Sequence, residues 1–223
     1  MKEILVSVVA VIPALNECTT IAAVIESLRS YLPVIVVDDG STDSTGDVAR
    51  EAGALVVRHE KNCGYDDALS TGLKRAAQSG YQFAVTLDAD GQHNPELIVE
   101  FIELLSRGYD IVIGVRDRMQ RLSEKIFAWW ARRLWGIEDP LCGMKGYRLA
   151  SFSEAPAFNS YQSIGTIYTV IAGKSAFKIA QISVQTRERV GRPRFSVLVA
   201  ADFLIMRAML RGLLLTKAIV AGA

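Results

Sequence analysis

The chain alternates short apolar segments with segments of helical character, and this alternation limits its possible folds more than any other feature. The apolar segments are continuous and rich in β-branched residues, as strands buried on both faces are. They lie at Ile4–Ile12, Val34–Val37, Ala54–Val57, Phe83–Leu87 and Ile111–Ile113. Helices are expected between them, at about 17–30, 43–52, 66–79 and 95–106. The pattern predicts an α/β fold with a mostly parallel sheet flanked by helices.

Four of the predicted strands end in polar residues. The strings that follow them are PALNE, DDGSTD, DADGQ and GVRDR. Sheets of this class bind ligands at the carboxyl ends of their strands. The candidate functional residues are therefore expected along one edge of the sheet.

Asp88 and Asp90 follow a strongly apolar strand and stand two residues apart. In an extended segment such residues project to the same side, so both carboxylates can reach one small volume. Their charges repel unless a cation lies between them. With the amide oxygen of Gln92 they suit Mg²⁺ or Mn²⁺. A solvated acidic turn is the alternative, but the strand before the pair and the helix cap at Asn94 after it favour a metal site.

The other acidic strand end, DDGSTD, suggests a nucleotide contact. Helix capping explains Ser41 and its neighbours adequately, but it explains Asp38 and Asp39 less well. A carboxylate at a strand end commonly accepts hydrogen bonds from a ribose or base, and we assign this role to Asp39. At the first strand end, Asn16 is a possible helix cap and Glu17 a possible nucleotide contact.

The charges are divided unevenly along the chain. Residues 1–115 contain 8 Lys and Arg against 17 Asp and Glu, whereas residues 116–223 contain 17 against 7. This division suggests that one half of the chain binds cations and the other half contacts anions, although ordinary solvated surface also explains it. The 3 cysteines show neither a disulfide framework nor a spacing typical of zinc sites, which favours a reducing compartment. No nucleic-acid partner is expected.

Two segments are candidates for contact with a membrane surface. The tail 197–223 shows an apolar face with Arg207 and Arg211 beside it, and Trp129 and Trp130 precede two arginines. Ordinary core packing or self-association explains both segments nearly as well, and oligomer formation stays open. No uncharged stretch reaches the length of about 18 to 20 residues that a transmembrane helix needs.

VIPALNE, VVDDGSTDST and LDADGQHNPE, in this order and spacing, resemble family 2 glycosyltransferases of the GT-A fold. GVRDR, EDPLCGMKGYR and RERVGRPRF are similar to the branch of that family that makes polyprenyl-phosphate sugars. The resemblance implies a single GT-A domain over 1–196, and the apolar face of residues 197–223 predicts an amphipathic helical tail after it. It also implies inverting transfer of a hexose from a UDP- or GDP-sugar to a polyprenyl phosphate. The enzyme would be cytoplasmic and peripheral at the inner face of the cell membrane.

The resemblance further implies a role for individual residues. The nucleotide-sugar contacts would be Pro13, Ala14, Glu17, Asp39, Asp88 and Gln92. The ligands of Mg²⁺ or Mn²⁺ would be Asp88, Asp90 and Gln92. The catalytic residues would be Asp90, Arg116, Arg132 and Asp139. The acceptor phosphate would meet Arg148, Arg192 and Arg194.

The acceptor side departs from the family pattern. The family's D-x-T/M-S-G-F-R reads as DPLCGMK, so the aromatic residue and the arginine fall later, at Tyr147 and Arg148. A hydroxyl acceptor would need a general base, for which Asp139, Glu138 and His93 are candidates. A phosphate acceptor needs none, because it is already largely dianionic at neutral pH. Transfer to a hydroxyl of a glycan or glycolipid stays an alternative, as does a non-catalytic module that binds nucleotide sugars.

Overall fold

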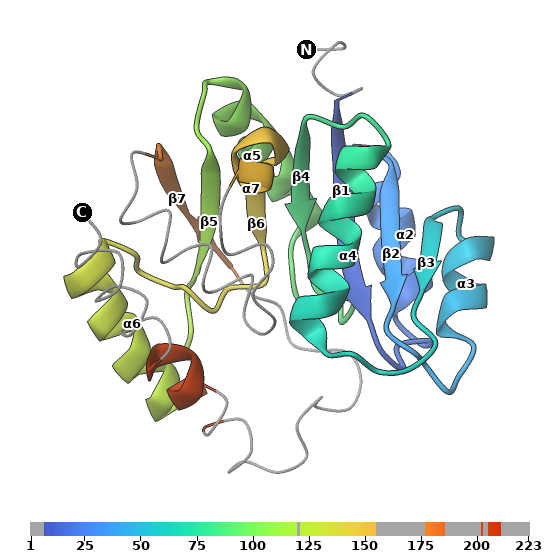
Figure 1. The fold of residues 1–223 in the computed structure, drawn as a ribbon, viewed down its shortest axis with the longest axis horizontal. Helices are drawn as coiled ribbons and strands as arrows, with labels where there is room; N and C mark the ends of the chain where they lie inside the picture. The colour runs from blue at the N-terminus through green and yellow to red at the C-terminus, as the bar shows by residue number, and fades with distance from the viewer. Residues whose placement is uncertain (1–6, 120, 155–176, 186–201, 203–204, 211–223) are drawn as a thin grey trace.

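The computed structural model describes residues 7–119, 121–154, 177–185, 202 and 205–210. These residues form one seven-stranded sheet with the order β3-β2-β1-β4-β6-β5-β7 (Figure 1). The strands are β1 (Val8–Ala14), β2 (Val34–Asp38), β3 (Leu55–Arg58), β4 (Phe83–Thr86), β5 (Ile111–Arg116), β6 (Lys145–Arg148) and β7 (Ile179–Val184). Every neighbouring pair is parallel except the two that involve β6. The predicted α/β class and mostly parallel sheet are confirmed.

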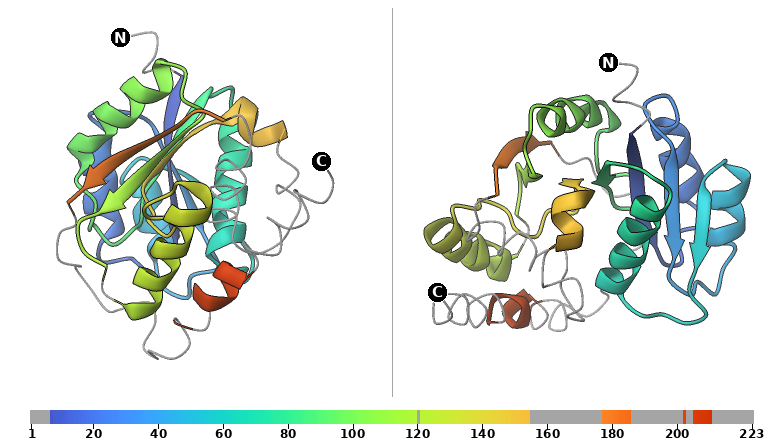
Figure 2. Two further views of the ribbon diagram at one scale, coloured as in Figure 1. Left: turned by 90° about the vertical axis from the view of Figure 1, so that its left-hand side faces the viewer. Right: turned by 45° about the horizontal axis from the view of Figure 1, so that its top comes forward.

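Helices cover both faces of the sheet (Figures 1 and 2). They are α2 (Ile21–Leu28), α3 (Thr45–Glu51), α4 (Tyr65–Gln78), the 3₁₀ turn η1 (Pro95–Leu97), α5 (Ile98–Ser106), α6 (Leu122–Trp135) and α7 (Leu149–Glu154). Residues of α2, α3 and α5 pack with the sheet in one buried apolar cluster. Residues of α4 and α6 pack against the other face in a second cluster. The result is a layered α/β domain with helices on both faces of the sheet.

The helix boundaries follow local backbone chemistry. The Asn94 side chain accepts a hydrogen bond from the backbone of Glu96, and Pro95 begins η1, as the sequence indicated. The helix expected from residue 17 begins only at Ile21, because residues 15–20 form the loop that approaches the second strand. Gly136 ends α6 with a positive φ of 69°, which glycine adopts without strain.

Three elements were not predicted from the sequence: β6, α7 and β7. Residues 145–148 form β6, which runs antiparallel between β4 and β5, and α7 follows it. The segment near 163–174, for which no assignment was made, and most of the tail 197–223 lie outside the described residues. In the part of the chain that the structure describes, no helix is both long and apolar enough to cross a membrane.

Candidate functional site

The carboxyl ends of β1, β2, β4 and β5 lie along one edge of the sheet, the lower edge in Figure 1. The antiparallel strand β6 begins at the same edge, because Lys145 pairs with Thr86 at the end of β4. The polar strings that the sequence placed after the strands therefore lie along this edge. We call it the carboxyl edge.

The loops after β1 and β2 are joined by hydrogen bonds. The backbone nitrogen of Asn16 donates to Ser41 Oγ at 3.0 Å, and that of Glu17 donates to Thr45 Oγ1 at 2.8 Å. Asn16 has a positive φ of 53°, and its side-chain oxygen accepts from the Thr42 backbone at 2.9 Å. Asn16 therefore joins two loops instead of capping a helix. Pro13 and Ala14 are buried at the end of β1, and Glu17 is 6% exposed beside them.

Asp39 extends this edge toward β3. One carboxylate oxygen accepts from the Cys63 backbone at 2.9 Å and lies 2.7 Å from His59 Nδ1. The other oxygen accepts from the Gly64 backbone at 2.8 Å. The predicted nucleotide contact is thus also the anchor of loop 59–64, a role that the sequence did not indicate.

Asp88 and Asp90 line one hollow, together with residues of α2, Gly91 and His93. Asp90 is 3% exposed, and its Oδ1 accepts from the Gln92 backbone at 3.1 Å. Oδ2 of Asp88 lies 3.3 Å from Nε2 of the buried His93. Both residues therefore border one hollow, and the metal-ligand role of their carboxylates stays a prediction.

The donor set of this hollow fits a divalent metal ion. Two carboxylates in one hollow are oxygen ligands of the kind that Mg²⁺ and Mn²⁺ prefer. Among the described residues, His93 Nδ1 is also buried without a hydrogen-bond partner. A buried polar atom of this kind is costly unless it meets a ligand or water. The side chain of Gln92 stays a predicted ligand.

Arg116 and Asp139 form a buried pair at the end of β5. Arg116 Nε donates to Asp139 Oδ2 at 2.7 Å, and Nη2 donates to Oδ1 at 3.1 Å. Burial alone would lower the pKa of Arg116, but the hydrogen bonds and charge of Asp139, with the charge of Glu124, raise it above its usual value. Asp139 is 1% exposed and also accepts from the Leu141 backbone. Both carboxylate oxygens are therefore engaged, which leaves Asp139 poorly placed as a general base.

Gly143 and Lys145 belong to this edge although the sequence did not single them out as site residues. A Cβ at Gly143 would lie 2.2 Å from Asp88 Oδ2, so the loop before β6 packs directly against the carboxylate of Asp88, a predicted metal ligand. The amine of Lys145 donates to the Pro140 carbonyl at 2.9 Å, and burial lowers its pKa. The Thr86 hydroxyl donates to the Gly143 carbonyl at 2.8 Å and further ties this loop to β4. Only tertiary contacts reveal these roles.

Gly143→Ala is expected to reduce metal-dependent activity by about a hundredfold, because a misplacement of about 1 Å at a reacting centre has an effect of that size. The added methyl group would displace the Asp88 carboxylate. Turnover of nucleotide sugar measures the effect, and thermal unfolding of the same variant checks that it folds. Wild-type turnover in a folded Gly143→Ala protein would contradict this placement of Asp88.

The structure does not bring all predicted arginines together. Arg148 ends β6 opposite Phe83, at the start of β4, and its Nε lies 3.3 Å from Asp110 Oδ1. Five strand residues, about 16 Å, separate that position from Asp88. The predicted contact of Arg148 with the acceptor phosphate does not fit this place, because β6 is antiparallel and carries the residue to the opposite edge. Arg132 is exposed on α6, and Arg192 and Arg194 lie outside the described residues.

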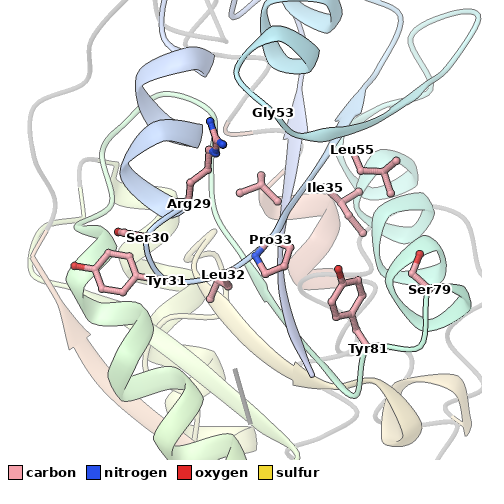
Figure 3. A pocket seen from close by; sticks show the side chains of 11 residues that line it. Arg29, Ser30, Tyr31, Leu32, Pro33, Ile35, Gly53, Leu55, Ser79 and Tyr81 are labelled. Carbon is pink, nitrogen blue, oxygen red and sulfur yellow. The ribbon is translucent and has the colours of Figure 1, made fainter. Parts of the chain in front are cut away.

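A second hollow lies at that opposite edge (Figure 3). Its lining includes Arg29, Tyr31, Pro33 and Tyr81, from segments that precede β2 and β4. Arg29 is held there by a hydrogen bond of 3.1 Å to the Ala52 carbonyl. None of the predicted site residues that the structure describes lines this hollow, so the carboxyl edge remains the candidate functional site.

Comparison with known proteins agrees with the fold and the motifs. The chain is 28% identical over 211 residues to the UDP-N-acetylglucosamine–dolichyl-phosphate N-acetylglucosaminyltransferase of Methanococcus voltae, covering 79% of this chain and 84% of that protein. It is 31% identical over 161 residues to the undecaprenyl-phosphate mannosyltransferase of Micrococcus luteus, covering 63% and 66%. The chain spans 45% of the length of one curated relative, from Methanocaldococcus jannaschii, and 63% of the length of another, from Pectobacterium carotovorum.

Glucosyl-3-phosphoglycerate synthase from Mycobacterium tuberculosis, solved with Mg²⁺ and uridine diphosphate, has a similar structure. The TM-score is 0.77 at 25% identity, and the match covers 95% of this chain and 82% of that one. The sheet and its helices therefore have the GT-A architecture. Residues 9–164 match the family described as Glycosyl transferase family 2. By its motifs, its fold and this match, the chain belongs to glycosyltransferase family 2.

Proposed function

We propose that this protein transfers a hexose from a UDP- or GDP-sugar to a polyprenyl phosphate, with inversion, at the inner face of the cell membrane. The observation that carries the proposal is the hollow shared by Asp88 and Asp90 at the carboxyl edge. The relatives from Methanococcus voltae and Micrococcus luteus, whose names give dolichyl phosphate and undecaprenyl phosphate, support the choice of acceptor.

Asp88 and Asp90, with Gln92, would hold Mg²⁺ or Mn²⁺. When bound, the ion supplies Lewis-acid stabilisation of the charge that develops on the departing nucleoside diphosphate. Support comes from the Mycobacterium tuberculosis structure that contains Mg²⁺ and uridine diphosphate. Pro13, Ala14, Glu17 and Asp39 would contact the nucleotide, and they line the neighbouring strand ends.

The acceptor would bind between the metal site and Arg116. Asp139 holds the Arg116 guanidinium in one orientation through two hydrogen bonds. Nε and one N–H of Nη2 are taken by Asp139, so Nη1 and the second N–H of Nη2 would align a phosphate for attack on the anomeric carbon. A dianionic phosphate needs no general base. The engagement of Asp139 removes one of the three candidate general bases and so supports a phosphate acceptor.

Four exposed apolar residues on α6 would bring the protein to the lipid surface. Leu122, Ile126, Trp129 and Trp130 recur at helical spacing and are 73%, 39%, 59% and 37% exposed. Exposed basic residues, among them Arg132 and Arg133, stand beside them on the same helix. An apolar face rimmed by basic groups suits the interface of an anionic bilayer.

Replacing Trp129 and Trp130 with Ser is expected to weaken binding to anionic vesicles at least about tenfold, because each buried apolar side chain contributes about 1.5 to 3 kcal/mol. Vesicle flotation measures the change. Val99→Ser on α5 is the matched control, since Val99 is 52% exposed on another helix. Equal binding of the double variant and wild type would exclude this face. Loss of a dimer in gel filtration would instead assign it to self-association.

The acceptor is tested by offering radiolabelled UDP- and GDP-sugars with Mg²⁺ and three kinds of acceptor: polyprenyl phosphate, glycan and glycolipid. The proposal predicts label in a lipid product whose phosphodiester is cleaved by mild acid. An acid-stable glycan or glycolipid product would show that a hydroxyl is the acceptor. A folded protein that binds a nucleotide sugar but consumes none with any acceptor would be a binding module.

A further inference from the structure

Asp39, His59 and Cys63 bring three different ligand groups to one point of the carboxyl edge. Asp39 follows β2, His59 follows β3, and Cys63 lies two residues before α4. One ligand atom from each residue lies within 4.8 Å of the other two. Asp39 is buried, His59 half-buried and Cys63 exposed, so the cluster is open to solvent on one side.

The backbone holds this cluster in place. The nitrogen of His59 donates to the Asp38 carbonyl at 2.9 Å, which fixes the start of loop 59–64. The nitrogens of Cys63 and Gly64 donate to Asp39 and fix its end. A Cβ at Gly40 would lie 2.5 Å from the carbonyl carbon of Lys61, so the loop packs directly on the turn after β2. The three side chains therefore need little ordering to bind one ion.

The chemistry of the three groups differs from that of the Asp88 and Asp90 hollow. Thiolate, imidazole and carboxylate together suit Zn²⁺ or Co²⁺, whereas oxygen ligands alone suit Mg²⁺ or Mn²⁺. His59 Nε2 lies 2.9 Å from Thr71 Oγ1, the kind of outer partner that orients a metal-bound histidine. With Nδ1 on the metal, Nε2–H would donate to this hydroxyl, and the proton of the Cys63 thiol would pass to solvent.

The other two cysteines are poorer ligands. A hydrogen bond to Asp43 raises the pKa of Cys18, and burial raises the pKa of Cys142 to about 12. Cys142 is fully buried against the sheet. The cysteine spacing did not indicate a zinc site, because the ligands of this cluster come from three segments and only one of them is a cysteine.

We propose that Asp39, His59 and Cys63 form a second metal site, for Zn²⁺ or a similar ion, that competes with the nucleoside of the donor. The competition rests on the proposed function, in which Asp39 contacts the base or ribose. Both oxygens of Asp39 already accept backbone hydrogen bonds, so an ion bound to this carboxylate takes the lone pair that the nucleoside would use. Coupling between two ligands is reciprocal, so each then weakens the other. Zinc therefore inhibits transfer by occupying the nucleoside end of the donor site.

Cobalt titration of the full-length, metal-free protein tests the site without any donor. In a non-thiol reductant, Co²⁺ is expected to bind and give thiolate-to-cobalt absorption at one equivalent. The chain has 3 cysteines, so each thiolate that could give that absorption can be replaced in turn. Cys63→Ser abolishes the absorption, Cys18→Ser retains it, and His59→Gln weakens cobalt binding at least about tenfold. No thiolate absorption in wild type, or absorption that survives in Cys63→Ser, overturns the site.

Zinc inhibition tests the competition separately. Wild type and Cys63→Ser are assayed with the same nucleotide sugar, so chelation of zinc by the diphosphate is equal in both. The half-inhibitory zinc concentration is expected to rise at least about tenfold in Cys63→Ser. Equal inhibition overturns the competition. If neither protein transfers sugar, the proposed function fails. The cobalt absorption still tests whether Asp39, His59 and Cys63 bind a metal ion.

Discussion

Asp90→Asn is expected to reduce sugar transfer at least about a hundredfold, with the protein still folded. Asn keeps the size of the side chain but removes the charge that would hold the metal ion. Asp90 is 3% exposed in the shared hollow, so solvent ions compensate poorly for that loss. Removing one preorganised electrostatic contact from a reacting centre commonly costs a factor of about 10² to 10³. Initial rates at saturating Mn²⁺ and donor measure the effect.

Asp47→Asn is the matched control for this prediction. Asp47 lies on α3, its side chain is 65% exposed, and it pairs with Arg50 at 2.7 Å. The same chemical change there is expected to leave both transfer and stability close to wild type, because exposed ion pairs contribute little. A rate for Asp90→Asn within about threefold of the control would contradict a catalytic metal at this hollow.

Asp139→Ala is expected to lower the free energy of unfolding by about 3 kcal/mol, because the partly buried guanidinium loses its two hydrogen bonds and keeps only Glu124, at 3.7 Å. The side chain of Arg116 is 19% exposed and that of Asp139 is 1% exposed. Urea unfolding measures the change through the midpoint and slope of the transition.

The double variant Arg116→Met with Asp139→Leu separates stability from function. Apolar side chains of similar size often replace a buried ion pair without loss of stability. The double variant should therefore regain most of the stability lost in Asp139→Ala, yet transfer no sugar to polyprenyl phosphate. Transfer at the wild-type rate would show that Arg116 does not bind the acceptor.

The nucleotide half of the fold could be predicted because its signals are local. The β-branched residues of a strand such as Val34–Asp38 indicate that the strand is buried, and the polar residues after it indicate where the strand ends. The strand β6 gives no such signal, since Lys-Gly-Tyr-Arg is short and lacks β-branched residues. The antiparallel direction of β6 places Arg148 at the edge opposite Asp88. Because the sequence does not indicate this direction, it could not show that Arg148 lies away from the predicted acceptor site.

The types of residue in the candidate site could be predicted from the sequence, but not which of these residues contact one another. Asp139 and Arg116 were both predicted as catalytic residues, but their mutual hydrogen bonds join segments 23 residues apart. His59 was missed for the same reason, since its contact with Asp39 spans 20 residues. Such contacts depend on how the strands are ordered in the sheet, which local patterns do not encode.

Calorimetric titration with UDP- and GDP-sugars, with and without Mn²⁺, tests most directly whether the carboxyl edge is a metal-dependent donor site. We expect one sugar nucleotide to bind wild type at one equivalent, and Mn²⁺ to strengthen this binding at least about tenfold. The double variant Asp88→Asn with Asp90→Asn is expected to abolish the Mn²⁺ effect. Equal affinity with and without Mn²⁺ in wild type, or an undiminished Mn²⁺ effect in the double variant, would contradict a metal-dependent donor site at this edge.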